Sequence, residues 1–130
     1  MDLKLGKIAQ IAHSVADVDA AEAFYERTLG LTKLFRPSPD MVFFDCGGVR
    51  LLQIQAHEPE AIAKASVLYL QCEDIVGTAA ELKRRGAEFL DEPHRVAEQP
   101  GYDIWMTFLK DPDGHLLALE MHAPTGWAPS

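Results

Sequence analysis

Few residues of this chain have both the type and the spacing that chemistry needs. Its 130 residues include 5 histidines and 2 cysteines. Cys46 and Cys72 lie far apart in apolar segments and form no CxxC or Cys/His spacing of the kind that binds zinc. No Ser/His/Asp or Cys/His set is spaced for covalent catalysis. We therefore interpret the two thiols as small buried hydrophobic groups, which leaves acid–base chemistry to histidines and carboxylates.

Glu120 and His94 are the candidate catalytic residues. Glu120 lies in the apolar segment 115–122, and strand alternation places it on the same face as Ala118 and His122. An isolated carboxylate on such a face carries a desolvation cost. We therefore expect Glu120 near the mouth of the ligand site, solvated or paired with a polar ligand group, and an ion is the alternative partner. His94 lies in the irregular stretch 93–103, which we expect to form a lid or rim loop.

The other histidines are weaker candidates. His13 has the opposite parity to Gln10 on its strand and is expected to pack on the helix side. His57 lies in the connection 56–65, which reads as solvated, and His115 follows a turn, so both are expected in solvent. His122 is expected to be exposed near the chain end.

The first half of the chain contains a strand, a helix and three further strands. Asp17 is a typical helix N-cap, apolar residues follow it at helical spacing, and Gly30 stands where a helix ends. The Gly47-Gly48 pair favours a tight hairpin turn. The predicted strands are 7–15, 32–35, 41–46 and 49–55.

The second half repeats this order. Asp74 is a second N-cap, and basic residues precede Gly86 at the end of the second predicted helix. Residues 111–114, Asp-Pro-Asp-Gly, are typical of a turn between paired strands. The predicted strands are 66–72, 88–91, 104–109 and 115–122.

These elements predict an α/β (α+β) fold of two βαβββ modules in one domain, residues 1–130. The modules span about residues 7–56 and 65–123. One such sheet cannot cover both of its faces, so we expect the modules side by side with their helices outside. The resulting cup-shaped mixed sheet would have a concave inner face, which is the natural place for a small-molecule ligand.

Charge and hydropathy exclude several classes of partner. The formal net charge is -8, from 20 acidic and 12 basic side chains, which disfavours nucleic acid and anionic membrane surfaces. The N-terminal segment has no uninterrupted apolar core, and no apolar stretch approaches the ~20 residues of a membrane helix. We therefore expect a cytoplasmic protein.

Several segments together resemble the vicinal oxygen chelate superfamily, which includes glyoxalase I, bleomycin-resistance proteins, methylmalonyl-CoA epimerase and extradiol dioxygenases. The first module matches through QIAHSVADV (10–18), AFY (23–25) and LGL (29–31). The second matches through CEDI (72–75), Leu82, Gly86 and Phe108 with the DPDG turn (111–114). The resemblance covers nearly the whole chain and implies paired βαβββ modules, and usually a homodimer.

The resemblance also implies where a divalent metal would be bound. Metal-dependent members place one ligand on each of four strands, and these positions fall on Gln10, Leu52, Val67 and Ala118. Three of these side chains are hydrocarbons and offer a cation no lone pair, so we expect no standard metal site. The alternative is a rewired site in which Gln10 and Glu120 share an ion.

Two activities of the superfamily lack their residues here. In glyoxalase I an arginine four residues after the first ligand holds the glutathione carboxylate, and Ser14 stands at that position. The two His and one Glu of extradiol dioxygenases are missing as well. Glyoxalase I activity proper and extradiol cleavage are therefore not expected.

We predict a metal-free binding protein for a small, partly aromatic molecule. The alternatives are a lyase or isomerase that uses Glu120, with His94 or a rewired metal, and a non-catalytic interaction module. The predicted ligand-binding residues are Gln10, Ser14, Leu52, Val67, Tyr69, His94, Met106, Phe108, Ala118 and Glu120.

Overall fold

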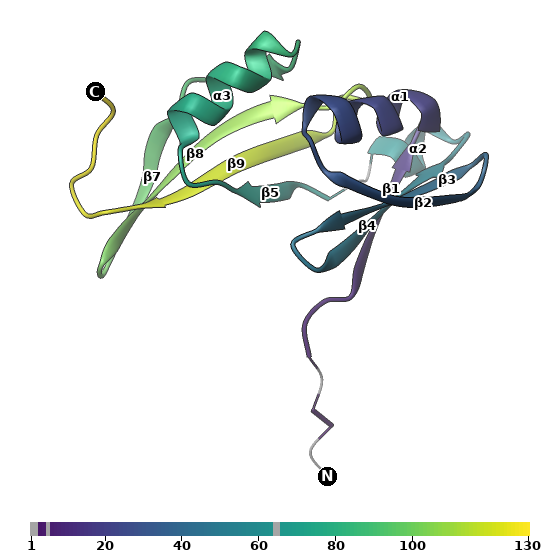
Figure 1. The fold of residues 1–130 in the computed structure, drawn as a ribbon, viewed down its shortest axis with the longest axis horizontal. Coiled ribbons are helices and arrows are strands. Elements are labelled where there is room, and N and C mark those ends of the chain that lie inside the picture. Colours follow the sequence, from purple (N-terminus) through teal and green to yellow (C-terminus); the bar gives the residue numbers. More distant parts are fainter. Residues whose placement is uncertain (1–2, 5, 64–65) are drawn as a thin grey trace. The chain divides into compact units, whose positions relative to one another are not determined.

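The computed structural model describes residues 3–4, 6–63 and 66–130. The chain divides into two compact units, residues 1–65 and 66–130, each with its own mixed sheet (Figure 1). The mixed α and β architecture confirms the predicted fold class. No helix among the described residues is long and apolar enough to cross a membrane. The arrangement of both modules in one domain around a cup stays a prediction.

The first unit is a four-stranded sheet in the order β1-β4-β3-β2. Strand β1 runs parallel to β4, and the other neighbours are antiparallel. The Gly47-Gly48 hairpin joins β3 to β4, with φ of 62° and 91° at its two glycines, as the sequence predicted. The elements are β1 (Gln10–Val15), α1 (Val18–Ala23), the π-helical turn η1 (Phe24–Thr28), β2 (Thr32–Ser38), β3 (Met41–Cys46), β4 (Val49–Gln55) and α2 (Pro59–Ala63).

Helix α1 begins at the N-cap that the sequence predicted, and the helical segment ends at the predicted glycine. The Asp17 carboxylate accepts the backbone N–H of Asp19 at 2.9 Å, which confirms the predicted N-cap. The helix continues as η1, and Gly30 then leaves it with φ of 77°. Tyr25, fully buried, packs against Phe44 of β3 with ring centroids 6.0 Å apart.

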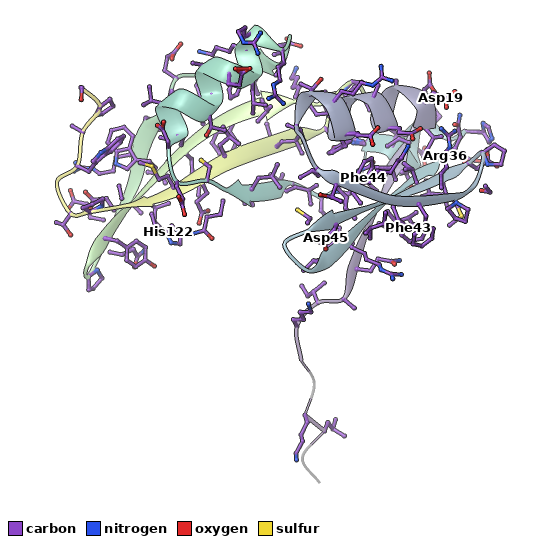
Figure 2. All side chains as sticks on the ribbon, in the orientation of Figure 1. Asp19, Arg36, Phe43, Phe44, Asp45 and His122 are labelled. Atoms are coloured by element: carbon purple, nitrogen blue, oxygen red, sulfur yellow. The ribbon has the colours of Figure 1, made fainter. Side chains whose placement is uncertain are left out.

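Ion pairs join the exposed side of α1 to β2. Glu22 accepts from Lys33 at 2.7 Å and pairs with Arg36, which also reaches Asp19 (Figure 2). The hydrogen bond from Lys33, reinforced by Arg36, lowers the pKa of Glu22 against the opposing effect of partial burial.

The second unit is a five-stranded sheet in the order β5-β9-β8-β6, with β7 also paired to β8. Strand β5 is parallel to β9, as β1 is to β4 in the first unit. Asp74 caps α3 by accepting the Gly77 N–H at 3.0 Å, and Gly86 follows the helix with φ of 94°. The elements are β5 (Leu68–Gln71), α3 (Ile75–Arg84), β6 (Glu88–Phe89), β7 (His94–Gln99), β8 (Tyr102–Lys110) and β9 (Leu116–Ala123).

Two segments differ from the sequence-based expectation. The stretch 93–103 is not a lid loop: most of it forms β7, which pairs with β8 through a tight turn at Pro100-Gly101. Pro and Gly there close a hairpin rather than interrupt structure, since Gly101 has a φ of 94°. The connection 56–65 contains the short helix α2, which the sequence analysis did not predict.

Each sheet has one face toward its long helix and one face away from it. In β9 the residues Leu117, Leu119 and Met121 are buried, and α3 packs over β8 and β9 with its own buried stripe (Figure 1). The alternate residues Ala118, Glu120 and His122 occupy the opposite face, as predicted. We call the faces away from α1 and α3 the open faces of the first and second sheets.

The C-terminal tail, residues 124–130, contacts β8 through a hydrogen bond and an aromatic contact. The Asp103 side chain is 1% exposed, and its Oδ2 accepts the Gly126 N–H at 2.9 Å. Trp127 meets Trp105 edge to face, with ring centroids 5.0 Å apart. Both tryptophans of the chain therefore belong to one contact.

Replacing Asp103 by alanine is expected to release this tail. The Gly126 N–H loses its charged acceptor, a loss of about 1–2 kcal/mol in the free energy of tail docking. The measurement is intrinsic tryptophan emission, which should shift to longer wavelength as Trp127 enters water. Asp45→Ala, which removes a turn contact in the first unit, is the control. Unchanged emission in Asp103→Ala would mean that the tryptophan contact holds the tail without Asp103.

Candidate functional site

A hydrogen-bonded acid–base pair lies on the open face of the second sheet. Glu120 Oε2 is 2.7 Å from His122 Nε2, and the two residues are neighbours on one face of β9. The Tyr102 ring stacks on the His122 imidazole with centroids 4.8 Å apart. Figure 2 shows His122 on the side of the sheet away from α3. The sequence predicted that Glu120 shares this face and that His122 is exposed, but the contact between them is new.

Apolar and aromatic side chains surround this pair. Across the strands, Glu120 is in register with Gln71 on one side and Met106 on the other. The next row brings together Tyr69, Ala118 and Phe108. Ala118 is fully buried between these partners, whereas Tyr69 is 55% exposed. Glu120 therefore stands beside an aromatic surface with its carboxylate partly accessible, 23% exposed.

His94 is on the outer strand of the same sheet. It is in register with Met106, which is in turn in register with Glu120. Its Nδ1 lies 2.8 Å from the Glu92 carbonyl oxygen, and the ring is exposed. His94 is thus held at a strand end by a local contact, and Met106 lies between it and Glu120 in the strand register.

The predicted residues of the first unit share the open face of its own sheet. Gln10, exposed on β1, is in register with Arg50, and Ser14 with Ile54. Leu52 is on the same face and is 6% exposed. Val67 is the exception among the predicted residues, because it precedes β5 rather than lying within a strand.

The donors needed for the superfamily's metal are not present at the corresponding positions. Leu52 and Ala118 are buried hydrocarbons, and Val67 offers a third hydrocarbon. Glu120 supplies one carboxylate two residues from Ala118, but its Oε2 is already bonded to His122. These residues do not fit the standard metal site. The rewired alternative through Gln10 and Glu120 stays a hypothesis.

Asp111, Asp113 and His115 form a compact acidic cluster with ligand atoms within 4.8 Å of one another. Asp111 Oδ1 accepts the backbone N–H groups of Asp113 and His115 at 2.9 and 2.8 Å, and Oδ2 lies 3.0 Å from His115 Nδ1. These bonds hold the turn between β8 and β9. The expectation that His115 is solvated was wrong, because it is 7% exposed and packs on Asp111. The cluster thus takes part in closing this turn.

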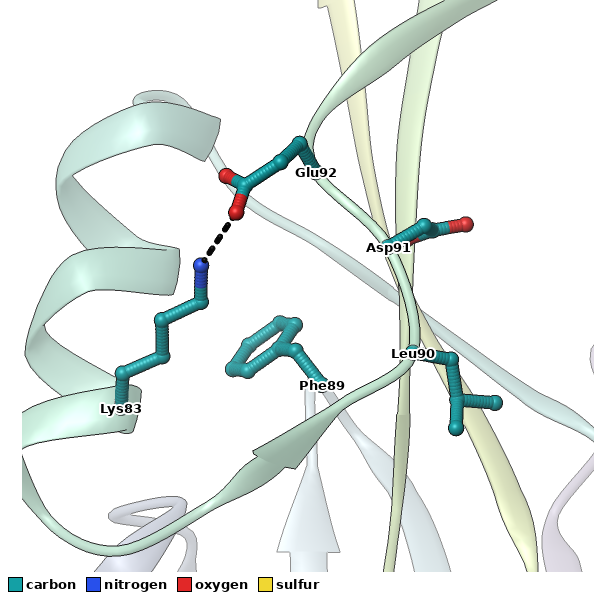
Figure 3. Close-up of a pocket in the computed structure, with 5 residues that line it drawn as sticks. All are labelled: Lys83, Phe89, Leu90, Asp91 and Glu92. Atoms are coloured by element: carbon teal, nitrogen blue, oxygen red, sulfur yellow. Dashed lines mark hydrogen bonds and ion pairs between the residues drawn. The ribbon is translucent and has the colours of Figure 1, made fainter.

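A pocket of about 360 Å³ lies beside α3 (Figure 3). Its lining is Lys83, Phe89, Leu90, Asp91 and Glu92, none of which the sequence proposed as a ligand contact. Lys83 Nζ bonds Glu92 at 3.1 Å and lies 5.5 Å from the centroid of the Phe89 ring. Lys83 is thus paired with Glu92 within the wall of the pocket, and Asp91 adds a second carboxylate.

The two thiols are less buried than the sequence predicted. Cys46 and Cys72 are free and half-buried. Burial raises the pKa of both thiols, and Asp45 adds to the effect at Cys46. Both are therefore protonated and weakly nucleophilic near neutral pH.

Sequence reasoning missed several polar residues on the two open faces. Arg50 and Gln71 are in register with the predicted ligand residues Gln10 and Glu120, and Tyr102 stacks on His122. Strand alternation is enough to place Arg50 on the same face as Leu52. Its identification as a candidate ligand-binding residue also requires the strand register that pairs it with Gln10. Tyr102 lay in the segment predicted as a loop, so its strand position was hidden.

Comparison with protein families gives a match over most of the chain. Residues 7–119 match the Glyoxalase/Bleomycin resistance protein/Dioxygenase superfamily model. The uncharacterized protein YetH of Bacillus subtilis (strain 168) is 41% identical over 59 residues. That alignment spans 44% of this chain and 42% of YetH.

Solved structures with the same fold cover nearly the whole chain. A glyoxalase/bleomycin resistance protein/dioxygenase from Alicyclobacillus acidocaldarius aligns with a TM-score of 0.71 at 23% identity, over 90% of this chain and 92% of its own. Lactoylglutathione lyase from Agrobacterium tumefaciens aligns with a TM-score of 0.72 at 20% identity, over 90% and 94%. TioX from Micromonospora sp. ML1 aligns with a TM-score of 0.71 at 18% identity, over 90% and 99%. At these identities the similarity concerns the fold alone.

Proposed function

Because the chain belongs to the Glyoxalase/Bleomycin resistance protein/Dioxygenase superfamily, we propose that it is a binding protein for small, partly aromatic organic molecules. The observation that carries this proposal is the Glu120–His122 pair, placed on an otherwise apolar and aromatic sheet face. In this proposal ligand binding requires no metal. The protein acts in the cytoplasm and forms a homodimer.

The open face of the second sheet favours a particular ligand chemistry. Tyr69 and Phe108 provide aromatic rings and Met106 a polarizable thioether, all of which suit a planar hydrocarbon. Glu120 offers a partly exposed carboxylate as an acceptor, and the contact of its Oε2 with His122 orients this carboxylate. A ligand with an aromatic ring and an ammonium or other hydrogen-bond donor satisfies both parts of this surface.

Glu120→Gln is expected to weaken the binding of an aromatic amine about tenfold. The reason is that a charge-assisted hydrogen bond contributes about 1.5–3 kcal/mol, and 1.4 kcal/mol corresponds to a tenfold change. The measurement is titration of the full chain with 1-naphthylmethylamine, followed by backbone amide shifts of β8 and β9. Naphthalene-1-methanol, which lacks the charge, is the matched ligand, and Glu98→Gln is the matched protein control on the exposed side of β7. Amide chemical-shift changes that are confined to residues outside the second sheet would refute a ligand-binding site at Glu120.

The same protein should bind little transition metal. Dialysis against Mn, Co, Ni and Zn, on protein made without an affinity tag, should leave well under one ion per chain. About one ion per chain, lost in both Glu120→Ala and Gln10→Ala, would favour the rewired site and an enzyme of the lyase or isomerase type.

Proton transfer by Glu120 is the second candidate function. The 2.7 Å contact places a carboxylate and an imidazole within one hydrogen bond of each other, as an acid–base pair requires. Turnover of a carbonyl or epoxide compound that is lost in both Glu120→Gln and His122→Ala would support this function over binding. The third possibility, an interaction module, would be favoured by a chain that binds neither aromatic amines nor metals.

A further inference from the structure

The open face of the first sheet carries an arginine that no acid neutralises. No carboxylate of the described residues lies within 4.0 Å of the Arg50 guanidinium. Arg36, Arg84 and Arg85, by contrast, all pair with acidic side chains. In a chain with a formal net charge of -8, an unpaired arginine among so many carboxylates calls for a physical explanation.

Arg50 lies over an aromatic ring rather than beside an acidic side chain. Its guanidinium carbon lies 5.6 Å from the Phe35 ring centroid. Phe35 stacks on Phe43 with centroids 4.7 Å apart and an interplanar angle of 20°. Phe35 remains 43% exposed, so this aromatic stack is not buried in the core. A guanidinium lying on a ring keeps its N–H groups free to bind a ligand.

The acid closest to Arg50 in the strand register is engaged elsewhere. Asp45 faces Arg50 across β3 and β4, but its Oδ1 accepts the Gly48 N–H at 3.1 Å and caps the hairpin. Figure 2 shows Phe43 and Asp45 on the same side of β3, with Phe44 on the α1 side. Asp45 is thus bonded to the hairpin backbone through Oδ1, and its carboxylate makes no ion pair with Arg50.

Two further groups beside Arg50 suit an anion. Gln10, its register partner on β1, is exposed and provides amide N–H donors. Lys7 donates to the Gly48 carbonyl at 2.9 Å, which holds a second cation at the same end of β4. Lys7 likewise has no carboxylate within 4.0 Å among the described residues.

From this arrangement we propose that Arg50 binds the carboxylate of a planar aromatic acid on the open face of the first sheet. The guanidinium takes both carboxylate oxygens, and the ligand ring lies on the apolar row next to it. That row consists of Ala12, Leu52 and Phe43, which are in register on β1, β4 and β3. The inference rests on the proposed small-molecule binding, but it concerns the other unit and other residues.

The test is a titration of the full isotope-labelled chain with 1-naphthoate and with the neutral 1-naphthamide. We expect naphthoate to shift the Arg50 Nε–H signal and the amides of β4, and to bind at least about tenfold more tightly than naphthamide. Arg50→Gln should remove this preference and Arg50→Lys should retain only part of it, because lysine lacks the planar fork. Arg95→Gln, which changes the charge equally in the second unit, should leave it unchanged.

Each other outcome contradicts the inference in a distinct way. Equal binding of the two probes on the first sheet would leave aromatic binding intact and remove the role of Arg50. Naphthoate that shifts only the second sheet would place anion recognition elsewhere. Absence of naphthoate binding at millimolar concentration would refute the Arg50 site, whereas the proposed function is judged separately by the aromatic amine and Glu120→Gln.

Discussion

Replacing Asp111 by alanine is expected to lower the free energy of unfolding of the second unit by about 3 kcal/mol. The Asp111 side chain is 1% exposed and serves two backbone N–H groups and the His115 ring. These contacts are buried or part-buried, and alanine removes the Asp111 carboxylate from all three of them. Urea denaturation followed by circular dichroism measures the change, and Asp111→Asn, which keeps one acceptor oxygen, should lose less.

A matched variant separates a structural turn from a cation site. Asp113 offers a carboxylate to the same cluster but is more exposed, so Asp113→Ala should change the free energy of unfolding by less than about 1 kcal/mol. Chelator, or millimolar calcium, should leave the midpoint of thermal unfolding of the wild-type chain unchanged. Stabilisation by calcium that disappears in Asp113→Ala would show that the cluster binds a cation.

Tyr25→Ala is expected to have the largest effect in the first unit, about 4 kcal/mol in the free energy of unfolding. Tyr25 is fully buried and contacts Phe24 edge to face at 5.2 Å as well as Phe44. Its loss leaves a cavity between η1 and the sheet. Tyr25→Phe, which preserves the ring, should remain folded and lose far less.

Tyr69→Ala is the matched control for this variant. Tyr69 is 55% exposed on an open face, so its truncation should cost less than about 0.5 kcal/mol. Urea denaturation of both variants gives the comparison. A loss at Tyr69 as large as at Tyr25 would mean that the open face is covered in solution, as in a tight dimer.

Local sequence signals predicted most of the fold. Asp17 and Asp74 cap their helices as predicted, and Gly47-Gly48 sets the register of its hairpin, because each of these features depends only on nearby residues. The strands 41–46 and 49–55 were predicted with their observed bounds. Strand β7 was missed because its polar, weakly alternating residues gain their strand form from pairing with β8, which local propensity does not report.

The sequence was enough to predict which residues of the candidate site share a face of the sheet, but not which side chains contact one another. Alternation placed Glu120 and His122 together, since that requires only a period of two. The bonding of Glu120 to His122, the stacking of Tyr102 and the position of Arg50 over Phe35 depend on rotamers and on register between strands distant in sequence. His115 was misplaced for a different reason: its burial follows from the closure of the local turn around Asp111, four residues before it.

Strand β7 also bears on how the protein behaves when concentrated. An outer strand with free backbone groups is a template on which other chains can add and aggregate. The register of β7 shifts between Arg95 and Ala97, and this irregularity interrupts the regular ladder that an added strand would need. Arg95 and Glu98, paired at 3.1 Å, place opposite charges along the same strand. Strand β7, which the sequence analysis missed, is thus an edge strand protected against the addition of other chains. Removing its register shift, or replacing Arg95 and Glu98 by uncharged residues, would promote aggregation before it altered ligand binding.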